Sequence, residues 1–130
     1  MLIVADSSIF LATVLDEPEK TRIIELTRGC ISYAPEILPY EIGNALSAMV
    51  KRGRLTDTEA IDAFDRYRRI PVYLVPIAVE QALTLASTFN IYAYDAYFLL
   101  CARTLKPSAL DRGMRHIARQ LNLVVLEVTP

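Results

Sequence analysis

The sequence predicts an α/β fold, a three-layer α/β/α sandwich with a central parallel sheet. Short apolar runs of the kind that form buried strands alternate with longer segments in which apolar residues recur at helical spacing. No tight-turn signal joins one apolar run to the next, which disfavours antiparallel hairpins. Parallel strands need crossover helices, and these helices cover both faces of the sheet. Ligands of such sheets bind beyond the carboxyl ends of the strands.

The first strand is expected at Leu2–Ala5, where apolar residues come directly before Asp6-Ser7-Ser8. Asp and Ser are good helix N-caps, so this tripeptide can end the strand and cap a following helix. Asp6 therefore falls at the carboxyl end of a predicted strand. The same apolar pattern predicts three further strands, at residues 30–34, 72–75 and 123–128.

Apolar residues at three- and four-residue steps predict the helices. An acidic segment with proline, residues 16–19, is typical of a first turn and opens a helix that Gly29 ends. Thr56 and Glu59 have the spacing of a capping box, which starts a helix that ends before Pro71. The remaining helices are predicted at residues 35–53, 77–89, 96–105 and 111–121.

Length and composition bound the class of protein. With 130 residues, of which 53% are hydrophobic, we expect a single domain over residues 1–130. The formal net charge of −1 does not favour a protein that coats nucleic acid by bulk attraction. No apolar stretch is long enough to cross a bilayer and the start lacks the basic residues of a signal peptide, so we expect a soluble, cytoplasmic protein without membrane contact. Cys30 and Cys101 lie in apolar segments without metal-binding spacing and are expected as reduced, buried thiols.

Three acidic residues lie where apolar packing normally excludes charge. Asp6 closes an apolar strand, and Glu41 and Asp95 lie within apolar, helix-like segments. A buried carboxylate must be protonated, paired with a cation or gathered around a metal. Taken singly, Asp6, Asp95 and Asp111 suit helix caps, and Glu41 borders a buried helical stripe. A purely structural account needs all four of these separate explanations to hold at once, whereas one shared metal site accounts for all four acids. The pattern therefore favours a shared metal site.

A pocket of Asp and Glu without nearby Cys or His suits a hard divalent cation, Mg²⁺ or Mn²⁺. Such an ion lowers the pKa of a bound water and neutralises charge that develops on a phosphodiester, so hydrolysis needs no side-chain nucleophile. Consistently, the sequence lacks GxSxG, Walker-type GxxxxGK, GxGxxG and HExxH motifs. These observations predict a metal-dependent enzyme that acts on phosphodiesters.

Several other residues have both a functional and a structural interpretation. Tyr92, Tyr94 and Tyr97 surround Asp95 and could stack on unpaired bases, but aromatic residues around a core helix more often serve packing, and we adopt that interpretation. His116 has no partner motif and is interpreted as a packing or surface residue. The basic runs within residues 51–54 and 66–69 are interpreted as solvated helix faces.

Four short motifs occur in a fixed order over nearly the whole chain: Asp6-Ser7-Ser8, EIGNAL at 41–46, YDAYFLLCA at 94–102 and LDRGM at 110–114. Each motif is weak alone, whereas their order and separation together are fairly specific. The pattern resembles the PIN domain family, in particular the single-domain VapC-type ribonuclease toxins of prokaryotic toxin–antitoxin pairs. The resemblance implies metal-dependent cleavage of RNA.

The resemblance also implies roles for the acidic residues. Asp6, Glu41 and Asp95 match the three acidic positions that hold the metal in the family, and Asp111 matches the fourth. Family members usually carry an apolar strand before the fourth acid, whereas residues 106–109 here read KPSA. Asp111 is therefore expected either as a direct metal ligand or as a residue that acts through water.

Further residues and partners follow from the same resemblance. Ser8 matches the small hydroxyl residue that supports the first aspartate, and Asn44 matches the polar residue one turn after the glutamate; both are expected to orient ligand oxygens by hydrogen bonds. Arg112 and Arg115 could contact RNA phosphate or pair with Asp111. The family also implies a homodimer and a cognate antitoxin protein that covers the cleft.

Two other classes of function remain as alternatives. The first is a PIN-like module that binds RNA or a protein without cleaving, which the complete set of acids disfavours. The second is another metal-dependent phosphoryl enzyme, such as a flap-type DNA nuclease, which is normally far larger, or a phosphatase with a DxDx motif. That phosphatase motif would need a second Asp where Ser8 stands.

Overall fold

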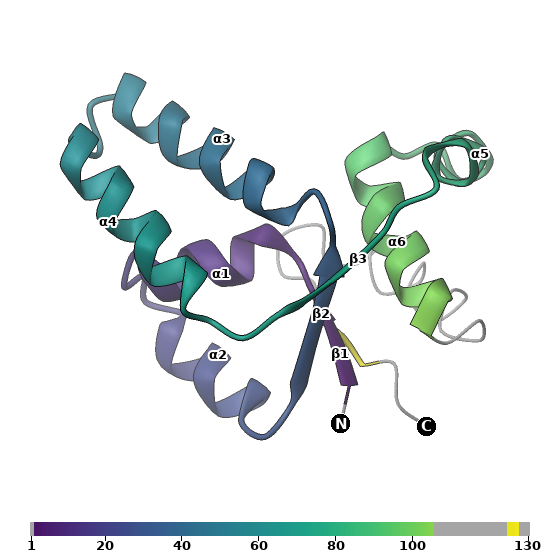
Figure 1. Cartoon of the computed structure of the whole chain (residues 1–130), viewed down its shortest axis with the longest axis horizontal. Coiled ribbons are helices and arrows are strands. Elements are labelled where there is room, and N and C mark those ends of the chain that lie inside the picture. The colour runs from purple at the N-terminus through teal and green to yellow at the C-terminus, as the bar shows by residue number, and fades with distance from the viewer. Residues whose placement is uncertain (1, 106–124, 128–130) are drawn as a thin grey trace.

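The computed structural model describes residues 2–105 and 125–127, and the fold in these ranges is the expected α/β class. Figure 1 shows a sheet in the middle with helices on both sides. The elements in chain order are β1 (Leu2–Ala5), α1 (Ser7–Val14), α2 (Lys20–Thr27), β2 (Ile31–Pro35), α3 (Leu38–Lys51), α4 (Asp57–Arg68), β3 (Tyr73–Val75), α5 (Val79–Phe89), α6 (Ala93–Leu105) and β4 (Val125–Glu127).

The sheet has the strand order β3-β2-β1-β4. β1 and β2 pair in parallel with Ile3 opposite Ser32, and β2 and β3 pair in parallel with Ala34 opposite Leu74. β4 runs antiparallel to β1, with Val4 opposite Leu126. The prediction of a parallel sheet is confirmed for β1, β2 and β3, and β4 adds an antiparallel edge of the kind that mixed α/β sheets often carry.

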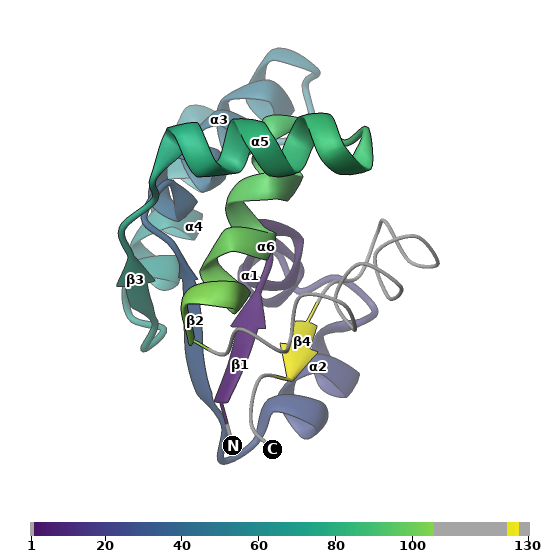
Figure 2. The ribbon, with the colours of Figure 1, turned by 90° about the vertical axis from the view of Figure 1, so that its right-hand side faces the viewer.

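Alternate residues of β1 enter different cores, and this gives the fold its layers. Val4 packs with residues of α5 and α6, including Leu99 and Leu100, on one face of the sheet. Ala5 packs with residues of α1 and α3, including Ile42, on the other face. Figure 2 shows α6 in front of the sheet, with α5 crossing in front of the upper end of α6. Because β1 is buried on both faces, it reads as a continuous apolar run.

Several helix boundaries differ from the predicted ones: α2 begins at Lys20, after the acidic segment that was expected to open it, and α3 begins at Leu38 rather than at residue 35. α1 occupies Ser7–Val14, where the sequence predicted a cap but no defined helix, and α6 begins at Ala93, three residues earlier than expected. The predicted helix at 111–121 lies outside the described residues. Among the described helices, none is both long and apolar enough to pass through a membrane.

Local capping signals are confirmed around α4. The Thr56 hydroxyl accepts the backbone N–H of Glu59 at 3.1 Å, and the Glu59 carboxylate accepts the backbone N–H of Thr56 at 3.0 Å. α3 ends shortly before Gly53, whose φ of +72° lies in the left-handed region that glycine adopts without strain. The local sequence therefore determines the turn between α3 and α4.

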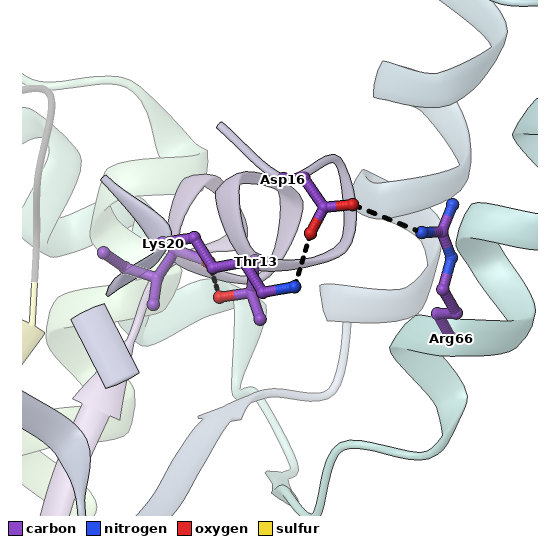
Figure 3. A network of polar contacts seen from close by, with 5 residues as sticks. Thr13, Asp16, Lys20 and Arg66 are labelled. Atoms are coloured by element: carbon purple, nitrogen blue, oxygen red, sulfur yellow. Dashed lines mark hydrogen bonds and ion pairs between the residues drawn. The ribbon is translucent and has the colours of Figure 1, made fainter. Parts of the chain in front are cut away.

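The turn between α1 and α2 is linked to α4 by an exposed ion-pair cluster, shown in Figure 3. Asp16 pairs with Lys20 and also with Arg66 of α4, at 3.7 Å from a guanidinium nitrogen to the carboxylate. The hydrogen bond from Lys20, followed by the positive charge of Lys20, lowers the pKa of the Asp16 carboxyl. We refer to these residues as the Asp16 cluster.

The two cysteines differ in their surroundings. Cys101 is fully buried in the core beside α5, and burial raises the pKa of its thiol to about 12, so the expected inert, buried thiol is confirmed there. The prediction of a buried thiol is wrong for Cys30, which lies just before β2 and is half-buried, with its sulfur 4.0 Å from the carbonyl oxygen of Arg28.

Candidate active site

Three predicted site residues come from three separate elements that meet at the carboxyl end of the sheet. Asp6 follows the last residue of β1, Glu41 lies in the first turn of α3, and Asp95 lies in the first turn of α6. Figure 1 shows the first turns of α3 and α6 facing each other near the end of β1 that leads into α1. All three residues are half-buried. We call Asp6, Glu41 and Asp95 the carboxylate site.

Asp6 serves as the N-cap of α1. Its Oδ1 accepts the backbone N–H of Ser8 at 3.0 Å and the hydroxyl of Ser7 at 3.0 Å. The structural interpretation of Asp6 as a cap is thus correct, but it uses one oxygen of the carboxylate. The other oxygen, Oδ2, accepts no hydrogen bond from the residues that the structure describes. Asp6 can therefore cap the helix and still offer an oxygen to a ligand.

Glu41 is the most perturbed carboxyl of the site. Its pKa is raised from 4.5 to about 7, first by burial and then by the negative charges of Asp6 and Asp95. No Lys or Arg in the described ranges offsets this shift. Repulsion of this kind falls off with distance, so the carboxylates of all three residues lie in each other's electrostatic range.

Asp95 is not a helix cap, contrary to the structural interpretation of the sequence. It is the third residue of α6, where the positive helix end would by itself lower its pKa. Instead, burial, followed by the charge of Asp6, raises the pKa of Asp95. Burial and repulsion therefore outweigh the helix dipole. Such a carboxylate is destabilised when ionised unless a cation lies beside it.

The two serines after Asp6 both donate to its carboxylate, Ser8 through its backbone N–H and Ser7 through its hydroxyl. The hydroxyl of Ser7, rather than that of Ser8, donates to the Asp6 carboxylate. The Ser8 Oγ is buried and has no hydrogen-bond partner, and it is the one buried side-chain polar atom in this condition within the described ranges. A buried hydroxyl without a partner is rare, because its desolvation is uncompensated. Ser8 can therefore donate to a ligand or an ordered water beside Asp6.

Of the other predicted site residues, apart from Ser8, the structure describes Asn44 alone. Asn44 is on α3 but exposed, and its side chain makes no hydrogen bond within residues 2–105 and 125–127. Asp111, Arg112 and Arg115 lie outside the described residues, so their roles stay predictions. Among the residues that are described, no group of three or more His, Cys, Asp or Glu side chains is already arranged to hold a metal ion.

Exposed tyrosines beside the acids were not predicted from the sequence. Tyr92 and Tyr94, interpreted as packing residues, are 84% and 59% exposed, whereas Tyr97 is half-buried and packs against the core. Tyr40, directly before Glu41, is 76% exposed. One sequence feature could have pointed to these tyrosines: each directly precedes, or lies a few residues before, an acidic site residue.

Comparisons with known proteins agree with the motifs. No protein-family model matches the chain. The chain is similar to the VapC ribonuclease Mb0985 of Mycobacterium bovis, with 25% identity over 114 residues, covering 88% of this chain and 87% of that protein. It is similar to the same extent to ribonuclease VapC9 from two strains of Mycobacterium tuberculosis. This similarity to proteins named as VapC ribonucleases, over most of the chain, supports the resemblance that the motifs implied.

Proposed function

We propose that this protein is a Mg²⁺- or Mn²⁺-dependent endoribonuclease, in which Asp6, Glu41 and Asp95 hold the metal at the scissile phosphate. The observation that carries the proposal is the carboxylate site itself. Three acids from distant parts of the sequence meet at the ligand-binding end of the sheet, and their burial and mutual repulsion raise the pKa of two of them. The similarity to proteins named as VapC ribonucleases supports RNA as the substrate.

The chemistry of the donor set fits such an ion. The site offers carboxylate oxygens without Cys or His, which is the preference of Mg²⁺ and Mn²⁺. The unpartnered hydroxyl of Ser8 beside Asp6 is suited to bond a water that such an ion retains. The described residues form no ready-made group of three ligands, so the proposal requires the carboxylates to draw together when the cation binds.

When bound, a divalent cation supplies Lewis acidity, which lowers the pKa of water and offsets negative charge on phosphate oxygens. The protein's own residues then have distinct tasks. Asp6 is held by its cap bonds to Ser7 and Ser8, which fix its carboxylate at the end of β1. Glu41 must lose its proton to act as a ligand, so binding of the cation is coupled to proton release near neutral pH.

Other parts of the proposal depend on the resemblance. Asp111 assists as a fourth acid, directly or through water, and Asn44 orients a ligand oxygen. Arg112 and Arg115 contact RNA phosphate. We further propose that the protein is the toxin of a toxin–antitoxin pair, a cytoplasmic, single-domain homodimer over residues 1–130 that a cognate antitoxin protein inhibits.

The direct test is RNA cleavage by purified protein, with Mg²⁺ or Mn²⁺ and with EDTA, beside the Asp6→Asn variant. Asn retains an oxygen that can cap α1, so the variant removes the charge without removing the cap. The proposal predicts cleavage that needs the metal and is lost in the variant. Equal cleavage by both proteins would indicate a contaminating nuclease. RNA binding without cleavage under any metal condition would instead support the non-cleaving PIN-like module.

A further inference from the structure

Three exposed tyrosines adjoin two acids of the carboxylate site. Tyr40 directly precedes Glu41, Tyr94 directly precedes Asp95, and Tyr92 is three residues before Asp95. The exposed fractions are 76% for Tyr40, 59% for Tyr94 and 84% for Tyr92. We call Tyr40, Tyr92 and Tyr94 the rim tyrosines. Their exposure leaves large aromatic surfaces in water beside the residues that the proposed chemistry uses.

The rim tyrosines are supported by the protein but not covered by it. The Tyr94 ring meets Tyr97 edge to face, with centroids 5.8 Å apart and planes at 89°, and Tyr97 packs against the core. The backbone carbonyl of Tyr92 accepts the N–H of Ala96 at 3.1 Å, which ties Tyr92 to the first turn of α6. Within the described residues, the rings of Tyr40 and Tyr92 contact no other aromatic ring.

Electrostatics at the site indicate why a substrate would need these rings. The carboxylates of Asp6, Glu41 and Asp95 repel a phosphate backbone, and no Lys or Arg in the described ranges forms an ion pair with them. A cation offsets part of this repulsion at one phosphate. The faces of unpaired bases in the flanking nucleotides can add binding free energy by stacking on aromatic side chains, which does not depend on the charge of the site.

We propose that Tyr92 and Tyr94, with Tyr40 beside Glu41, form a stacking platform that binds unpaired RNA bases next to the scissile phosphate. The inference rests on the proposed function and assigns the residues that hold the bases beside the cleaved phosphate. Adjacent Cα atoms are about 3.8 Å apart, so the Cα of Tyr92 lies at most about 11 Å from that of Asp95. Tyr92 and Tyr94 are therefore attached to the chain close to Asp95, and the proposal requires their exposed rings to face the nucleotides that flank a phosphate held there.

The test measures RNA binding in EDTA, where the proposed cleavage cannot occur, by the fluorescence anisotropy of a labelled single-stranded oligonucleotide. The variants are Tyr92→Ala and Tyr94→Ala, with Tyr92→Phe and Tyr94→Phe as matched controls that keep the ring. Stacking predicts a Kd that rises about 5- to 100-fold for each Ala variant and changes less than about 3-fold for each Phe variant. An abasic oligonucleotide of the same length should bind wild type and Ala variants equally.

Each other result has a defined meaning. Wild-type affinity in the Ala variants, or an equal loss in the Phe variants, would overturn the stacking platform while wild-type cleavage with Mg²⁺ still upheld the nuclease. Absence of both RNA binding and cleavage in the wild type would overturn both proposals. A change from dimer to monomer in the Ala variants, measured by light scattering, would identify the rim tyrosines as a protein interface. Because Tyr92 is 84% exposed, Tyr92→Ala should keep the wild-type Tm.

Discussion

Asp16, in the turn between α1 and α2, and Glu41, in α3, are both carboxylates, but their surroundings shift their pKa values in opposite directions. Asp16 is exposed and pairs with Lys20 and Arg66, and its pKa is lowered. Glu41 is half-buried beside Asp6 and Asp95, and its pKa is raised to about 7. The Asp16 cluster already contains its own cations, whereas the carboxylate site needs one from outside. The comparison separates an acid that supports the fold from acids that are available to a ligand.

The largest expected difference between the two regions is in RNA cleavage. Glu41→Gln removes a proposed metal ligand at nearly constant shape, and we expect its cleavage rate to fall on the order of 100-fold or more. Asp16→Asn is the matched change in the other region and should leave the rate within about 2-fold of wild type. Single-turnover assays at saturating Mg²⁺ measure both. Similar losses of cleavage rate in the two variants would show that the contrast between Glu41 and Asp16 does not distinguish residues needed for cleavage from residues needed for folding.

The next difference is in the pH dependence of stability without metal. The folded-state pKa of Glu41, about 7, is above its ordinary value of 4.5, so its contribution to stability is fully present below pH 4.5 and is lost as the pH rises through 7. Glu41→Gln should therefore match wild type at pH 4 and exceed it at pH 8. Glu41 is partly exposed, and after allowance for solvent screening we expect a gain of about 1–2 kcal/mol.

Thermal unfolding in EDTA at several pH values measures this effect, as a rise in Tm of roughly 3–6 °C at pH 8. The matched substitution in the Asp16 cluster should show no gain at pH 8. A Glu41→Gln variant less stable than wild type at pH 8 would contradict this prediction. It would mean that Glu41 has a stabilising partner and that its negative charge does not destabilise the metal-free protein.

The smallest expected effect is in the Asp16 cluster itself. The lowered pKa of Asp16 means that its contribution is present above pH 3.8 and is lost as the pH falls below that value. Because the pair is exposed, Asp16→Asn should change the Tm at pH 7 by about 3 °C or less, and added salt should reduce the difference. Measurements of the Tm of both proteins at low and high ionic strength test this prediction. A large, salt-independent loss would mean that the turn depends on Asp16 for more than its charge.

The sequence predicted the parts of the fold that local rules or two-sided burial determine. Leu2–Ala5 was predictable because a strand buried on both faces has no polar alternation, and the cap of α4 was predictable from Thr56 and Glu59. α1 was not given bounds, because apolar residues lie on most of its sides and leave a weak helical period. The antiparallel direction of β4 depends on how the chain returns to the sheet, which the strand's own residues do not encode.

The site was predictable in its location but not in its details. Ligands bind beyond the carboxyl ends of parallel strands, and this rule indicated Asp6 at the end of β1, while apolar surroundings indicated Glu41 and Asp95. Which serine hydroxyl donates to Asp6 depends on side-chain rotamers, and that of Ser7 does so whereas Ser8 donates through its backbone N–H. The exposure of Tyr92 depends on how α6 packs against its neighbours, and a residue pattern alone could not give it.

Binding of Mn²⁺ to the purified protein, measured by calorimetric titration near pH 7.5, tests the shared cation site most directly. We predict saturable binding by the wild type and by Asp16→Asn, with the affinity lost or lowered at least about 10-fold in Asp6→Asn, Glu41→Gln and Asp95→Asn. Unchanged Mn²⁺ affinity in all three of these variants, or no binding by the wild type, would contradict the account.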